Sequence, residues 1–111
     1  MLDITISRVE NATLIEVTGR VDSMTANELG ESLNQAINNG SVNIVLDLAG
    51  VEYMSSAGLR EIVGGLKRVK RANGDLRIAQ PTERVLEVFE MAGLDTILQI
   101  FSTQTEAVGS Y

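Results

Sequence analysis

The chain has 111 residues and a net charge of −6 at pH 7, with 44% apolar and 22% charged residues. These values are ordinary for one soluble globular domain with a sizeable core, and the length is too short for two. The absence of Cys and His excludes disulfides and thiolate metal sites, and it removes the usual base of a serine hydrolase and the commonest metal ligand.

The first forty residues predict a β-hairpin followed by a helix. Apolar and polar residues alternate over residues 2–17, with a turn at Glu10–Asn11 between the two strands. Apolar residues at helical spacing then mark one face of a helix over residues 26–37, which an Asn-Asn-Gly run ends. Asp22 or Ser23 is available as the N-cap of this helix.

A strand, a short loop and a second helix follow. The nearly unbroken apolar run over residues 42–48 predicts a strand buried on both faces, and the spacing over residues 59–69 is that of a helix. Ser55 and Ser56 therefore stand where this helix begins. The first turn of a helix carries unpaired backbone N–H groups and the positive end of the dipole. A serine there can be a simple N-cap, or it can carry a phosphate that the same N–H groups hold, and both interpretations stay open.

Two further features of this helix have alternative interpretations. Gly64 and Gly65 each cost roughly 1 kcal/mol relative to Ala, which indicates either close packing or a partner surface near them. Four basic residues lie between Lys67 and Arg71, ahead of an Asn73–Gly74 exit. A solvated helix end that complements the dipole explains this charge run more simply than a docking patch does.

The rest of the chain predicts a strand at 75–79, a helix within 81–93, a last short strand at 98–101 and a terminal helix after a capping box at 103–106. The strand at 75–79 should lie parallel to the strand at 42–48, with a right-handed crossover. The fold class is therefore α/β. We expect a small sandwich with a mixed four- to five-stranded β-sheet and about four helices packed mainly on one face.

Two stretches of the chain form a combined motif. The first is Gly19-Arg20-Val21-Asp22, and the second runs from Asp47-Leu48 through Val51 and Tyr53-Met54 to Ser55-Ser56-Ala57-Gly58-Leu59. They resemble the STAS domain family, specifically the anti-sigma factor antagonists of bacteria, in which a strand ends in Asp-Leu and Asp-Ser-Ser/Thr/Ala-Gly-Leu opens a helix. The resemblance covers essentially the whole chain and implies a single STAS domain over residues 1–111.

The resemblance implies a phospho-regulated switch for protein interaction rather than an enzyme. An unphosphorylated antagonist of this family binds an anti-sigma factor, which is also a serine-protein kinase of the GHKL ATPase type, and so releases a sigma factor. Phosphorylation of the loop serine ends the binding, and a metal-dependent phosphatase of the PP2C type restores it. The ATP would belong to the partner, so no cofactor, metal site or catalytic residue is expected in this chain.

Several residues in and near the serine loop have expected roles. The resemblance assigns phosphorylation to Ser56, with Ser55 as a minor alternative, although the family usually has Asp at the position of Ser55. Tyr53 is expected in the core with its hydroxyl reaching a partner or water, and Asp47 is expected to help fix the Ser56 loop. Met54 has a core interpretation that competes with contact to the partner. The expected partner-binding residues are Asp22, Met54, Ser55, Ser56, Ala57, Gly58 and Leu59.

Two other classes of function remain as alternatives. The first is a constitutive STAS scaffold or signalling-complex subunit that is not regulated at Ser56. The second, an enzyme or nucleotide-binding protein, is disfavoured because no Walker-type loop and no cluster of metal ligands is present. The net charge of −6 disfavours nucleic acid and anionic membranes as partners and favours a protein with a basic docking surface. No secretory signal and no apolar run of about 18 residues occurs, so we expect a cytoplasmic protein.

Overall fold

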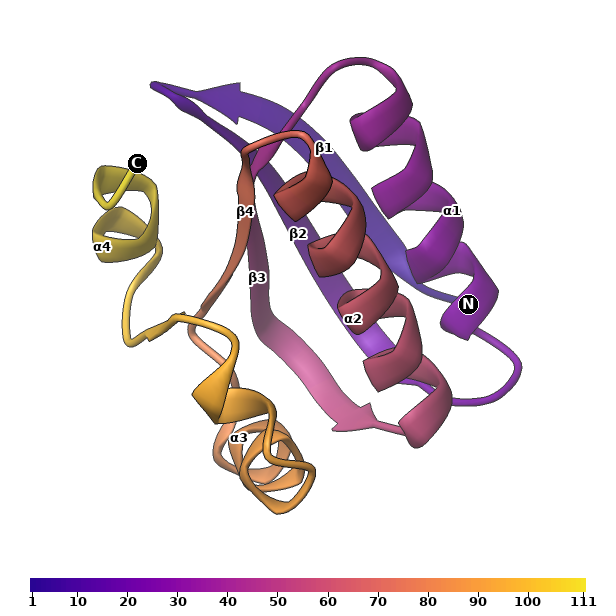
Figure 1. Ribbon diagram of the computed structural model, residues 1–111. Helices are drawn as coiled ribbons and strands as arrows, with labels where there is room; N and C mark the ends of the chain where they lie inside the picture. Colours follow the sequence, from indigo (N-terminus) through magenta and orange to yellow (C-terminus); the bar gives the residue numbers. More distant parts are fainter.

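The computed structural model describes all residues, 1–111, and contains one five-stranded sheet in the order β1-β2-β3-β4-β5 (Figure 1). β1 and β2 form an antiparallel hairpin, and the other neighbouring strands are parallel, so the sheet is mixed as predicted. The strands are β1 (Asp3–Val9), β2 (Ala12–Val21), β3 (Asn43–Met54), β4 (Asp75–Ala79) and β5 (Ile100–Phe101). The helices are α1 (Ala26–Asn38), α2 (Ser56–Arg71), α3 (Glu83–Met91), the 3-10 helix η1 (Leu94–Thr96) and α4 (Gln104–Gly109).

The helices cover the two faces of the sheet unequally. α1 and α2 lie side by side on one face, and α3 packs Val85 and Phe89 into the same core (Figure 1). The short α4 covers the opposite face, where Ala107 and Val108 contact Leu14 and Val45 in a smaller apolar cluster. This arrangement confirms the expected sandwich with helices mainly on one face. No helix is both long and apolar enough to span a membrane.

β3 is longer than the sequence predicted, because it continues past Leu48 to Met54. Gly50 lies so close to β2 that a Cβ there would be 2.5 Å from the Oγ1 atom of Thr18. The pairing of β2 with β3 shifts register twice along this part and ends with Val21 opposite Met54. Irregular pairing bends the strand, and Figure 1 shows β3 turning toward the start of α2.

The two adjacent glycines of α2 have different surroundings. A Cβ on Gly65 would lie 3.3 Å from Leu33 of α1, so Gly65 is explained by the close approach of the two helices. A Cβ on Gly64 would meet nothing within 4 Å. Packing inside the chain therefore explains why residue 65 is glycine, but it does not explain why residue 64 is glycine.

Candidate functional site at the start of helix α2

The site lies where two neighbouring parallel strands end. Val21 and Met54 are register partners at the ends of β2 and β3, and the backbone N–H of Ser55 donates to the Val21 carbonyl at 2.7 Å. Asp22 follows β2 directly, and Ser55 follows β3. The carboxyl ends of parallel strands are the usual place for functional groups in a sheet of this kind.

The two serines occupy different positions at the start of α2. Ser55 is the N-cap of α2, with extended backbone angles, and its Oγ accepts a long hydrogen bond of 3.4 Å from the Gly58 N–H. Ser56 is the first helical residue and is exposed, and its hydroxyl takes no part in the cap. Ser55 therefore supplies the cap, and the Ser56 hydroxyl lies exposed at a helix N-terminus, which is the kind of place that favours a phosphate.

Asp22 organises the loop that faces this helix start. Its Oδ1 accepts the backbone N–H groups of Met24 at 2.9 Å and Thr25 at 3.0 Å. These two bonds, helped by the Thr25 hydroxyl and the charge of Arg20, lower the pKa of the Asp22 carboxyl against a smaller opposing effect of desolvation. Helix α1 begins at Ala26, and its N-cap is Thr25, whose side chain makes no cap hydrogen bond, so the prediction that Asp22 or Ser23 is the N-cap is wrong.

We expect Asp22→Ala to lower the melting temperature at neutral pH and to matter less in acid. The folded-state pKa lies below the ordinary value, so the carboxylate stabilises the fold at neutral pH, and this stabilisation is lost as the pH falls through the folded-state pKa. The melting temperatures of both proteins, measured at about pH 7 and at successively lower pH down to about pH 2, test this expectation. The difference between Asp22→Ala and the unsubstituted chain should shrink as the carboxylate is protonated. A difference that stays constant would show that the charge of Asp22 plays no part.

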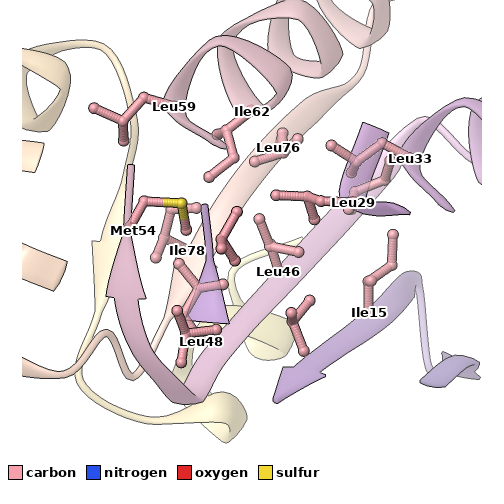
Figure 2. Close-up of a cluster of buried hydrophobic side chains, with 14 of the residues drawn as sticks. Ile15, Leu29, Leu33, Leu46, Leu48, Met54, Leu59, Ile62, Leu76 and Ile78 are labelled. Carbon is pink, nitrogen blue, oxygen red and sulfur yellow. The ribbon is translucent and has the colours of Figure 1, made fainter. Parts of the chain in front are cut away.

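The remaining predicted contact residues differ in how far they reach the surface. Met54 is only 2% exposed, and Figure 2 shows its sulfur directed into the apolar cluster. A Cβ on Gly58 would lie 2.4 Å from the Met54 sulfur and 2.6 Å from a methyl group of Val21, so Gly58 is a packing position. Ala57 is half-buried, and Leu59 lies at the edge of the cluster with 9% of its surface exposed. Among the residues predicted to bind a partner, those that reach solvent most are therefore Asp22, Ser55, Ser56 and Ala57.

Arg20 is a residue of this site that the sequence analysis did not single out for contact. Its guanidinium carbon lies 4.5 Å from the centroid of the Tyr53 ring, a cation–π arrangement between register partners at the strand ends. Tyr53 is half-buried rather than fully in the core. The sequence could have indicated Arg20, because it belongs to the motif Gly19 to Asp22 and lies two residues before Asp22. In the structure it lies beside the end of β3.

Asp47 does not serve the Ser56 loop as the sequence suggested. One of its oxygens accepts the Ala49 N–H at 3.0 Å, and the other accepts the side-chain amides of Gln80 at 3.0 Å and Gln104 at 2.7 Å. Gln104 is the first residue of α4, on the opposite face of the sheet from α2. Met54 lies seven residue steps along β3 from Asp47, a distance of roughly 20 Å. Asp47 therefore ties the short helix to the sheet.

We expect Asp47→Ala to lower the free energy of unfolding by about 2 kcal/mol, because it removes a buried carboxylate that accepts hydrogen bonds from three donors. Asp47→Asn should cost less than half of that, since the Gln80 and Gln104 amides can turn and present their oxygens to the new amide. Chemical denaturation of the three proteins measures both values. Equal losses in the two variants would contradict this account of the site.

Comparisons with known proteins agree with this architecture. The STAS domain family matches residues 3–107. The anti-sigma-B factor antagonist of Bacillus subtilis is 30% identical over 99 residues, which are 89% of this chain and 90% of that protein. A crystal structure of an anti-sigma factor antagonist from Mycobacterium paratuberculosis has a TM-score of 0.91 at 18% identity and covers 99% of this chain and 93% of its own.

Two structures of the antagonist SpoIIAA are also similar. Its unphosphorylated form has a TM-score of 0.82 at 20% identity, covering 96% of this chain and 93% of that one. Its phosphorylated form, from Bacillus, has a TM-score of 0.76 at 18% identity, covering 97% of this chain and 98% of that one. With the family match over residues 3–107, these findings show that the chain belongs to the STAS domain family, among the anti-sigma factor antagonists, which are regulatory binding proteins and not enzymes.

Proposed function

We propose that this chain is a phospho-regulated anti-sigma factor antagonist whose switch residue is Ser56. Unphosphorylated, it binds an anti-sigma factor that is also a GHKL-type serine kinase, and so releases a sigma factor in the cytoplasm. The kinase ends the interaction by transferring the γ-phosphoryl group of its own ATP to the Ser56 oxygen, with ADP as the leaving group and the hydroxyl proton passing to the kinase. A PP2C-type phosphatase hydrolyses the phosphoserine and restores binding. The functional unit is one STAS domain, residues 1–111.

The observation that carries this proposal is the division of labour between the two serines. Ser55 caps α2, while Ser56 is exposed at the first helical position with its hydroxyl unused by the cap. A serine needed only for structure would be expected at the cap. Relatives named anti-sigma factor antagonists support the choice of partner, and SpoIIAA, which has been seen in a phosphorylated form, has the same fold.

The phosphate would act on the complex and not on the fold. In the free protein, two negative charges at a helix N-terminus gain about 0.3 to 1 kcal/mol. In the complex, the same phosphate must lose water or face the carboxylates and nucleotide phosphates of the kinase. Binding therefore ends without any refolding of the chain.

Mass spectrometry of the protein isolated from its own cells tests the assignment. Peptide analysis before and after incubation with the GHKL-type kinase and Mg-ATP should place one phosphoryl group on Ser56. The group should be absent from Ser56→Ala and present in Ser55→Ala. Phosphate found on Ser55 alone would contradict the assignment to Ser56 and identify Ser55 as the switch residue.

The second candidate is a constitutive STAS scaffold. The observation that favours it is Ser55, which stands where the resemblance expects an Asp and offers the kinase a hydroxyl in place of a charge. An unmodified Ser56 under every growth condition, and after treatment with the kinase, would select the scaffold.

A further inference from the structure

A shallow apolar groove of about 440 Å³ lies close to Ser56, between α2 and the turn that joins α3 to η1. Its apolar lining includes Leu59, Val63 and Leu94, of which the last two are half-buried. Arg60 and Lys67 of α2 also line it, and both are exposed. The groove thus combines an apolar lining with two cationic side chains from one helix.

Gly64 also lines this groove. It is exposed, and nothing lies within 4 Å of the position that its Cβ would take. A glycine in the middle of a helix destabilises that helix, and Gly64 has no compensating contact inside the chain. A bare backbone at this place does allow a second helix to cross α2 closely.

The charge of α2 runs against that of the whole protein. Of the nine Lys and Arg residues of the chain, five lie in α2, together with only one of the fifteen Asp and Glu residues. The helix is therefore positive on a chain whose net charge is −6. Arg60 and Lys67, the two cations of the groove, form no salt bridge within the chain. The acidic chain as a whole favours a basic partner surface, but this groove favours an acidic one.

We propose that the groove binds an acidic amphipathic helix of the same anti-sigma factor that Ser56 controls. This inference rests on the proposed function and adds the chemistry of the partner's docking element. Ser56, Arg60, Gly64 and Lys67 follow one another at intervals of three or four residues, so they share one side of α2. Apolar side chains of the partner helix meet Leu59, Val63 and Leu94, and its carboxylates meet Arg60 and Lys67.

A second copy of this chain fits the groove less well. A two-fold interface would place the same basic helix opposite itself, and like charges facing one another oppose association. An acidic partner removes that repulsion.

Binding measurements with the purified GHKL-type anti-sigma factor of the same organism test the groove. Gly64→Gln fills the open position without changing charge and should weaken binding at least about tenfold, while its melting temperature should not fall, since Gln is the better helix former. Lys67→Glu should weaken binding roughly tenfold, with a slower association rate and a weaker dependence on salt. Arg71→Glu is the matched control, because it makes the same charge change at an exposed position of α2 outside the groove, and it should bind nearly as the unsubstituted chain does.

The outcomes separate this inference from the proposed function. Normal binding by Gly64→Gln, with equal effects of Lys67→Glu and Arg71→Glu, overturns the groove and leaves the Ser56 switch intact. If Gly64→Gln weakens binding but Ser56→Asp does not, the switch at Ser56 is overturned and the groove is supported. Failure of the unsubstituted chain to bind the anti-sigma factor overturns both. Sedimentation could instead show that the free chain is a dimer and that Gly64→Gln is a monomer. That result would assign the groove to a second copy of this chain.

Discussion

Ser56→Asp should weaken binding to the anti-sigma factor on the order of 100-fold and leave the fold unchanged. A charge buried against an interface that was formed around a neutral hydroxyl costs about 3 kcal/mol, which corresponds to that factor. The fold should tolerate the change, because position 56 is exposed and lies at the positive end of α2. The melting temperature of Ser56→Asp should therefore equal or slightly exceed that of the unsubstituted chain.

Calorimetric titration with the anti-sigma factor and Mg-ATP measures this effect, and two variants serve as controls. Ser56→Ala should bind as the unsubstituted chain does and resist inactivation by the kinase. Ser55→Asp makes the same charge change one residue earlier, and Asp is as good an N-cap as Ser. It should keep most of the affinity. A loss of affinity as large in Ser55→Asp as in Ser56→Asp would contradict a switch at one hydroxyl, because any charge in the loop would then have the same effect.

Local patterns in the sequence were enough to predict the start of helix α2, where Ser55 and Ser56 lie. The change of apolar period after Ser55–Ser56 marks a helix start, and a helix start is set by neighbouring residues alone. The β3-α2-β4 unit was predicted for the same reason, and its strands are parallel as expected. The resemblance grouped Asp22 with the serines as one expected site, and local patterns alone could not have done so, because the pairing of the two strand ends joins distant parts of the chain.

Features that depend on pairing across the sheet could not be predicted. Leu48, Val51 and Met54 all point into the main core, although they are three residues apart and a regular strand repeats every two. The register shifts in the pairing with β2 produce this spacing, and the sequence made Ala49–Gly50 look like the end of a strand. The same irregularity explains why Met54 could not be assigned to the core or the surface from its position. Asp47 was misplaced because two of its hydrogen-bond partners, Gln80 and Gln104, lie far along the chain.

Burial makes Met54→Ala the most destabilising change that we expect at this site. Met54 is 2% exposed and lies against Gly58 and Val21, so truncation leaves a cavity beside the start of α2. Such substitutions lower the free energy of unfolding by about 3 kcal/mol, and the melting temperature of a domain of this size falls by roughly 10 °C. Urea and thermal denaturation measure both quantities.

Met91 provides the matched control, since it is 88% exposed and Met91→Ala should change the stability very little. At temperatures below its unfolding transition, Met54→Ala should lose affinity for the anti-sigma factor only as far as the start of α2 is disturbed. Ser56→Asp, by contrast, should lose affinity while its stability is unchanged. The reverse result for Met54→Ala, normal stability with lost binding, would place this side chain in the interface and not in the core. The two variants together thus separate the residue that carries the signal from the residue that holds it in place.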